Sequence, residues 1–197
     1  MKFLVVGSTG LIGSYVAKTL SKHGTVIGVS RTTQISVDVK DPASIKAMYE
    51  KVGKVDAVAS CIGKVAFKPV AELTYEDYLI GLKDKALGQV ELVRAGIDFL
   101  NDAGSFTLMT GVLARDPIPS GSVAALANGA IESFTLAAAI DLPRGLRINT
   151  VSPNVLVEAT SYHASFPGFH QVTAQSVADA YVKSILGKQT GQIYKLD

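Results

Sequence analysis

Residues 3–13 read Phe-Leu-Val-Val-Gly-Ser-Thr-Gly-Leu-Ile-Gly, and this stretch decides the fold. Its first four residues form a continuous apolar run, which predicts a strand buried on both faces. A helical pattern follows, with apolar residues recurring every three or four positions. Between a strand and a helix, glycines at this spacing allow a tight turn and the close approach of a pyrophosphate, which the helix N-terminus attracts. We therefore expect a phosphate-binding loop made of Gly7, Ser8, Thr9, Gly10, Leu11, Ile12 and Gly13, with an ordinary glycine-rich turn as the alternative.

Apolar runs and helical patterns alternate along the rest of the chain. The strand-like runs are apolar throughout, which is typical of a parallel sheet covered by helices on both faces. We expect further strands at 25–29, 34–39, 55–60, 105–110, 147–151 and 192–196, and helices at about 42–52, 75–100, 122–142 and 173–186. No linker or repeat divides the chain, so residues 1–197 are predicted to form one α/β domain with a doubly wound Rossmann fold.

Three glycines, Gly81, Gly88 and Gly96, fall inside the long helical pattern at 75–100. Each lowers helix propensity by up to about 1 kcal/mol relative to alanine. Close packing of this helix against its neighbours would explain them.

Composition and charge exclude several classes of protein. The 197 residues are 48% hydrophobic, which excludes a disordered chain, and the net charge is only +2. Because no basic block stands out, we expect no nucleic-acid partner. Because no targeting segment and no uncharged membrane-spanning stretch are visible, we expect a cytoplasmic protein that does not bind membranes. The lone Cys61 fits a reducing compartment, and no His or acidic pair has metal-ligand spacing, so we expect no metal.

The end of the second strand indicates which dinucleotide the loop would hold. An NAD site has an acidic residue about 20 positions after the glycines, which binds the ribose 2′-hydroxyl. Here the strand ends in Ser30-Arg31-Thr32-Thr33, with no acid. Arg31 can pair with a 2′-phosphate, and Ser30 and Thr32 can donate hydrogen bonds to it. This pattern favours NADP(H) over NAD(H), with a solvated surface arginine as the alternative.

The combined pattern resembles the short-chain dehydrogenase/reductase family over nearly the whole chain. The loop at 7–13 is similar to that family's cofactor loop. Residues 147–153, Arg-Ile-Asn-Thr-Val-Ser-Pro, are similar to its Arg-hydrophobic-Asn-x-hydrophobic-x-Pro pattern and give the most specific match. The resemblance implies a seven-stranded parallel sheet, a small-molecule substrate and a homodimer or homotetramer. Its subunit interface would use the Ala-rich helix at 122–142 and the long helix before it.

The resemblance also implies positions that contact the cofactor. Asp38 and Val39 match the pair that contacts adenine, and residues 60–63 lie where the family has Asn-Asn-Ala-Gly. In the family, the residues that follow the proline of this pattern, here Pro153, lie at the nicotinamide. The implied contacts are therefore Asp38, Val39, Cys61, Gly63, Pro153, Asn154 and Val155.

The chain departs from the family at its catalytic centre. Alignment puts Ala124 at the position of the family's catalytic Tyr and Asn128 at that of its Lys. Thr110-Gly111 stands where the family has its Ser, and Lys85 aligns near its Asn. Ala124 has no proton to give, and the neutral Asn128 cannot lower a neighbour's pKa by charge.

The candidate catalytic residues are therefore Thr110 for the carbonyl oxygen, Asn128 for the nicotinamide ribose, and Lys85 for charge or a proton. Their alternatives are a strand-end Thr bonded locally and a solvated helix Lys. Other polar residues have plainer interpretations: Ser122 as a helix N-cap, Tyr162 and His163 as loop residues, and Cys61 as a small packed side chain.

Taken together, the residues predict an NADP(H)-dependent oxidoreductase that reduces a small carbonyl compound or oxidises the alcohol. One alternative is a catalytically silent NADP-binding redox sensor or partner-binding subunit, which the missing Tyr and Lys support. Another is a site for a different nucleotide or an adenosyl cofactor, against which the residues at 38–39 and 147–153 argue.

Overall fold

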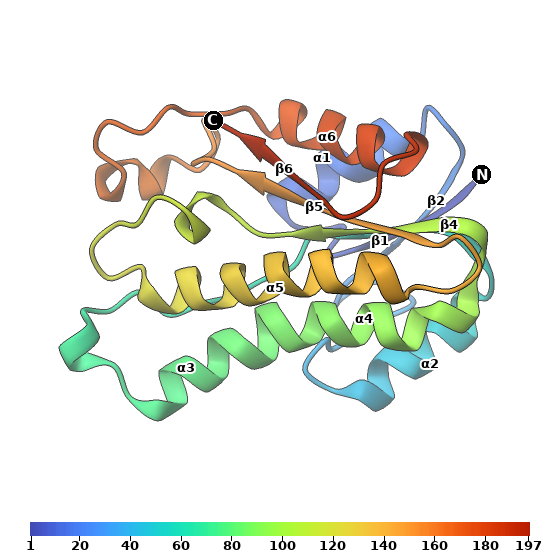
Figure 1. The fold of residues 1–197 in the computed structure, drawn as a ribbon, viewed down its shortest axis with the longest axis horizontal. Coiled ribbons are helices and arrows are strands. Elements are labelled where there is room, and N and C mark those ends of the chain that lie inside the picture. Colours follow the sequence, from blue (N-terminus) through green and yellow to red (C-terminus); the bar gives the residue numbers. More distant parts are fainter.

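A parallel sheet with helices on both faces is the frame of the computed structural model, which describes all 197 residues (Figure 1). Its six strands lie in the order β2-β1-β3-β4-β5-β6. They are β1 (Lys2–Val6), β2 (Thr25–Val29), β3 (Val55–Ser60), β4 (Leu100–Met109), β5 (Arg147–Pro153) and β6 (Gln192–Leu196). The order reverses between β1 and β3, and ligands of open α/β sheets bind at the carboxyl ends of strands at such a switch point.

Six α-helices connect the strands and divide between the two faces. They are α1 (Leu11–Leu20), α2 (Pro42–Val52), α3 (Tyr75–Gly81), α4 (Gly88–Gly96), α5 (Ser122–Asp141) and α6 (Ala174–Leu186). Helices α1 and α6 cover one face, and α2, α4 and α5 cover the other (Figure 1). Strand β1 is buried on both sides, with Leu4 and Val6 in one core cluster and Phe3 and Val5 in the other.

The prediction of a seventh strand at 34–39 is wrong. This segment makes a single parallel bridge, between Ser30 and Ser36. Side-chain hydroxyls bond the backbone groups that a strand ladder would use: Thr33 Oγ1 bonds the Ser30 N–H and the Ile35 carbonyl, and the Ser44 hydroxyl accepts from the Asp38 N–H. Local side-chain bonds of this kind compete with sheet formation.

The long helix predicted at 75–100 is present but not uniform. A π-helical turn, η2 (Leu82–Leu87), joins α3 to α4, and a 3₁₀ turn (Ile97–Phe99) leads into β4. The glycines do allow close packing: a Cβ on Gly81 would lie 2.5 Å from Val123 Cγ1, and one on Gly96 would lie 2.5 Å from the Tyr49 hydroxyl. A capping box of Thr74 and Asp77 starts α3.

Helix α5 is the one helix whose length and apolar composition would suit a membrane span. In the structure it packs on the sheet, where Ala127 and Ile131 are fully buried in the core shared with α2 and α4. Two of its other apolar side chains, Leu136 and Ile140, are exposed on its outer side.

Candidate functional site

The glycine loop packs so tightly that side chains would not fit at two of its positions. Gly7 has φ +84°, and a Cβ there would lie 2.6 Å from the carbonyl oxygen of Cys61. A Cβ on Gly13 would overlap the Gly7 carbonyl group and lie 2.7 Å from its carbon. The first turn of α1 is therefore held directly against the loop that ends β1.

The N-terminus of α1 is open to a phosphate. Its N-cap is Gly10, so no side chain bonds the first N–H groups, and no acidic residue stands in the first turn. Such free N–H groups and the helix dipole favour an anion. This arrangement fits the predicted phosphate-binding role of the loop.

A groove of about 390 Å³ runs from this loop along the ends of β1 and β2. Arg31 is exposed at its edge and has no ion-pair partner. The Ser30 hydroxyl accepts a hydrogen bond from the Thr32 N–H at 3.2 Å, and the Asp38 carboxylate accepts one from the Lys40 N–H at 3.0 Å. The predicted residues that line the groove are Gly7, Thr9, Gly10, Ser30, Arg31, Thr32, Asp38, Val39, Cys61 and Gly63.

Four residues of the predicted loop do not line this groove: Ser8, Leu11, Ile12 and Gly13. The Ser8 hydroxyl donates to the Val29 carbonyl at 3.4 Å, and the Leu11 side chain is exposed. Two charged residues outside the prediction also line it, Lys64 and Asp84, and the Lys64 N–H donates to the Asp84 carboxylate at 2.8 Å. No motif in the sequence joins these two residues, which are 20 positions apart.

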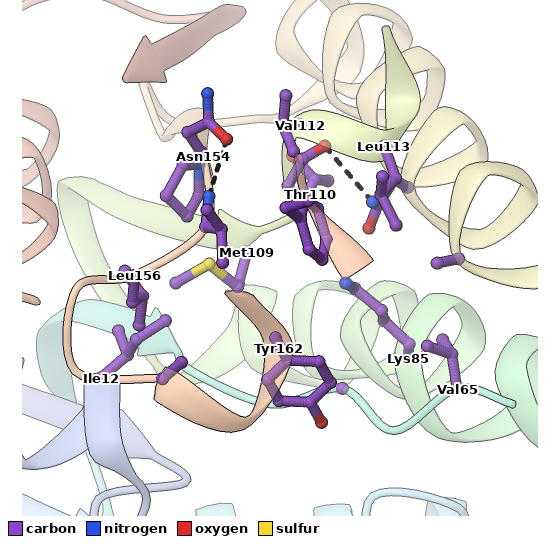
Figure 2. A pocket seen from close by; sticks show the side chains of 18 of the residues that line it. Ile12, Val65, Lys85, Met109, Thr110, Val112, Leu113, Asn154, Leu156 and Tyr162 are labelled. Atoms are coloured by element: carbon purple, nitrogen blue, oxygen red, sulfur yellow. Dashed lines mark hydrogen bonds between the residues drawn. The ribbon is translucent and has the colours of Figure 1, made fainter. Parts of the chain in front are cut away.

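A second cavity, of about 280 Å³, opens beside the groove and shares Cys61, Ile62 and Gly63 with it (Figure 2). Its wall is mostly apolar and draws on loops after β3, β4 and β5. The predicted residues Ile12, Pro153, Asn154 and Val155 line it, as do Ala124 and the three candidate catalytic residues Lys85, Thr110 and Asn128. Sequence reasoning missed the apolar wall of Val65, Phe67, Val112, Leu113 and Phe166.

Asn128 lines this cavity and carries an unpaired acceptor. Its side chain is buried, and its Nδ2 donates to the Gly111 carbonyl at 3.3 Å. Its Oδ1 is buried without a hydrogen-bond partner. Since an unpaired buried acceptor is costly, the position suits a ligand hydroxyl that donates to it.

Thr110 is buried with its hydroxyl already bonded. It donates to Glu132 Oε1 at 2.9 Å, and the Ser152 hydroxyl donates to the same oxygen at 3.0 Å. Arg115 bonds Ser152 in turn and forms an ion pair with Asp197. A substrate oxygen would therefore compete with Glu132 for the Thr110 proton. Glu132 stands one helical turn after Asn128, and this spacing is the only signal that the sequence offers for it.

Lys85 extends its amine into the cavity, on the side where Thr110 lies (Figure 2). It stands on η2, and π-helical turns occur frequently at functional sites. Its stem crosses Gly63, where a Cβ would lie 2.7 Å from Lys85 Cγ. Burial lowers the pKa of the Lys85 amine to about 8. By accessible surface the residue is half-buried, so it lies between a packed and a fully solvated helix lysine.

The remaining polar residues take structural positions. Burial raises the pKa of the Cys61 thiol to about 12, so Cys61 is a neutral packed side chain, as expected. His163 bonds the Leu156 carbonyl at 2.9 Å and does not line the cavity, whereas Tyr162 does. The interpretation of Ser122 as an N-cap is wrong: Gly121 holds that position, and the Ser122 hydroxyl has no partner.

These residues fit a nicotinamide dinucleotide. The glycine cradle and the open N-terminus of α1 suit its pyrophosphate, and the unpaired Asn128 Oδ1 suits a ribose hydroxyl. The groove at the loop is continuous with the apolar cavity, because Cys61, Ile62 and Gly63 line both of them.

Comparison with known proteins agrees with this geometry. Residues 10–191 match the family model described as "Enoyl-(Acyl carrier protein) reductase". The chain is 25% identical to the hydroxynaphthalene reductase arp2 of Aspergillus fumigatus, over 76% of this chain and 64% of that protein. It is 27% identical to a tetrahydroxynaphthalene reductase of Pyricularia oryzae, over 82% of this chain and 66% of that protein. It thus spans slightly less than two thirds of the length of these relatives.

Solved structures are similar over the whole chain. The crystal structure of the protein lin1944 from Listeria innocua is 48% identical, with a TM-score of 0.98 and 100% of both chains covered. A small-chain dehydrogenase solved in complex with NADPH is 26% identical, with a TM-score of 0.89, and covers 100% of this chain and 96% of its own. The fold, the glycine cradle and the family match together show that the chain belongs to the short-chain dehydrogenase/reductase family of oxidoreductases.

Proposed function

We propose that this protein is an NADP(H)-dependent oxidoreductase that reduces a small carbonyl compound or oxidises the corresponding alcohol. The observation that carries the proposal is the joining of two cavities at Cys61–Gly63. One is a polar groove with an unpaired Arg31 at its edge. The other is an apolar chamber that holds a lysine, a threonine and an orphan asparagine oxygen. A dinucleotide and a carbonyl substrate need these two environments next to each other.

Each part of the groove has a proposed task. The loop and the start of α1 hold the pyrophosphate, and Asp38 and Val39 contact adenine. Arg31, Ser30 and Thr32 hold the 2′-phosphate, which is the basis of the preference for NADP(H) over NAD(H). Asn128 accepts a hydrogen bond from the nicotinamide ribose, and Pro153, Asn154 and Val155 lie against the nicotinamide. When bound, NADPH supplies the hydride.

The chain's own residues act on the substrate oxygen. The Lys85 ammonium is the only charged side chain that lines the apolar cavity, so it stabilises negative charge on that oxygen. The Thr110 hydroxyl supports it by turning from Glu132 toward the substrate. Ala124 lines the same cavity and leaves room where a larger side chain would stand.

Thr110→Val tests this arrangement. We expect kcat/KM with NADPH and a carbonyl panel (benzaldehyde, cyclohexanone, benzoylformate) to fall about fivefold, because one neutral hydrogen bond contributes about 1 kcal/mol. Thr135→Val is the matched control, since Thr135 is buried against Thr150 and does not line the cavity. Equal rates in wild type and Thr110→Val would remove Thr110 from the site. NADPH binding without turnover of any compound would favour the catalytically silent redox sensor. Ala124 supports that alternative, because it lines the cavity and has no proton to give.

We also propose that the protein forms a homodimer or homotetramer through α4 and α5, which lie side by side on one face of the sheet (Figure 1). The support is apolar exposure: the side chains of Leu136 and Ile140 on α5 are 53% and 86% exposed, and Leu87 beside α4 is 58% exposed. A helix that is apolar on its outer side as well is usually buried in an interface.

Ile140→Glu should disrupt this assembly, because a charge placed in an apolar interface loses its hydration. We expect light scattering after gel filtration to report the monomer mass for the variant and a multiple of it for wild type. A monomeric wild type would contradict the proposed assembly. For localisation we propose the cytoplasm, supported by the single, unpaired Cys61.

A further inference from the structure

The Lys85 ammonium has no anionic or hydrogen-bonding partner in the protein. No residue with an acidic side chain lines its cavity, and the other titratable groups there are the Cys61 thiol and the Tyr162 hydroxyl. Burial alone lowers the pKa of the amine to about 8, so most of it carries its proton at pH 7. Lys85 is half-buried, so its ammonium has lost part of its hydration without gaining an anion in the protein, and an anion that binds it restores the lost stabilisation.

The carboxylates that could neutralise Lys85 are engaged elsewhere. Asp84, its neighbour on η2, accepts the Lys64 N–H at 2.8 Å and lines the nucleotide groove. Glu132, the acid bonded to Thr110, accepts the hydroxyls of both Thr110 and Ser152. The charge of Lys85 is therefore left for a molecule that enters the cavity.

The stem of the Lys85 side chain packs against the backbone of Gly63. Gly63 has φ +148° and no side chain, which lets the stem of Lys85 lie across its backbone. Any Cβ at position 63 would collide with that stem, 2.7 Å from Cγ and 2.8 Å from Cδ. The contact with Gly63 directs the amine toward the cavity that Lys85 lines.

The rest of the cavity limits the ligand's size and polarity. At about 280 Å³ it lies just below the usual range of ligand pockets, about 300 to 1,000 Å³, and the nicotinamide would share this space with the substrate. Hydrophobic residues form most of its wall. This wall suits a compact apolar frame, and only Lys85 offers it a charge.

We infer that the substrate of this site is a compact, apolar carbonyl compound that also carries one anionic oxygen, a carboxylate or an enolate, which binds the Lys85 ammonium. The inference rests on the proposed function and adds the substrate class to it. Uncharged ketones would leave the ammonium unpaired, and large or multiply charged substrates would not match a small apolar wall.

Ligand binding to the purified full-length chain tests the inference without need of turnover. The probes are benzoate, the cyclic diketone dimedone (an enolate at neutral pH) and neutral benzamide, titrated at pH 7 by NMR with NADP⁺ present. We expect one of the two anions to bind at least about tenfold more tightly than benzamide, because hydrogen bonds to charged groups are strong. Preference for benzoate identifies a carboxylate and preference for dimedone an enolate.

Substitutions at one π-helical turn make the test specific. Lys85→Met should reduce anion affinity to that of benzamide, Lys85→Arg should restore most of it, and the exposed Lys83→Met on the same turn should change nothing. Raising the pH well above 8 should remove the preference in wild type, because the cation is lost. NADPH binding with no anion preference would overturn the inference alone. Absence of NADPH binding would overturn the proposed function and the inference with it.

Discussion

Gly13→Ala should weaken cofactor binding strongly: we expect its affinity for NADPH to be at least about 100-fold lower than that of wild type. The added methyl group would overlap the Gly7 carbonyl and lie 3.0 Å from Ser8 Cα. Both are backbone atoms, which cannot move aside as a flexible side chain can. The loop must then separate from α1, and these two elements are the ones proposed to supply N–H groups to the pyrophosphate.

Gly129→Ala is the matched control for Gly13→Ala. Gly129 lies within α5, and a Cβ there would meet nothing within 4 Å. The same substitution should therefore leave NADPH binding intact and stabilise the helix by up to about 1 kcal/mol. NADPH fluorescence titrations and thermal melts measure both effects. A folded Gly13→Ala protein with wild-type affinity would show that the loop does not hold the cofactor.

Arg31→Ala should remove the preference for NADPH over NADH. We expect the Kd for NADPH to rise about 30-fold, because hydrogen bonds to charged groups contribute about 1.5–3 kcal/mol each. The Kd for NADH should change less than about twofold, since NADH lacks the 2′-phosphate. The side chain is exposed and unpaired, so its loss should not affect the fold.

The control for this prediction is Arg94→Ala on α4. This substitution removes the same charge as Arg31→Ala. Arg94 is bonded to Glu91 and lines neither cavity. Competition titrations with both cofactors give the four affinities that the comparison needs. Equal affinity of wild type for NADPH and NADH would refute the assignment of Arg31.

The parts of the fold that depend on local sequence could be predicted. The run at 3–13 predicted β1, the loop and α1, because strand, turn and helix signals follow one another directly. The seventh strand was wrong because the hydroxyls of Thr33 and Ser44 bond its backbone, and their bonding is not visible in a hydrophobic pattern. The π-helical turn at 82–87 was missed because its apolar spacing differs little from that of an α-helix.

The candidate site was only partly predictable, for a similar reason. The glycine loop is one segment, so its spacing is visible in the sequence. The cavity combines side chains from three separate elements: Lys85, Thr110 and Asn128. From the sequence, only the family resemblance indicated that these three residues share a site. The bond between Thr110 and Glu132 depends on how α5 lies on the sheet, which no pattern within α5 specifies.

A crystal structure of the protein with NADP⁺ tests the central claim most directly. We predict the pyrophosphate at the N-terminus of α1, the 2′-phosphate within hydrogen-bonding distance of Arg31, and a ribose hydroxyl donating to Asn128 Oδ1. The nicotinamide would then enter the apolar cavity beside Lys85 and Thr110. A nucleotide whose nicotinamide end lies outside that cavity, with Asn128 Oδ1 still unpaired, would contradict the account.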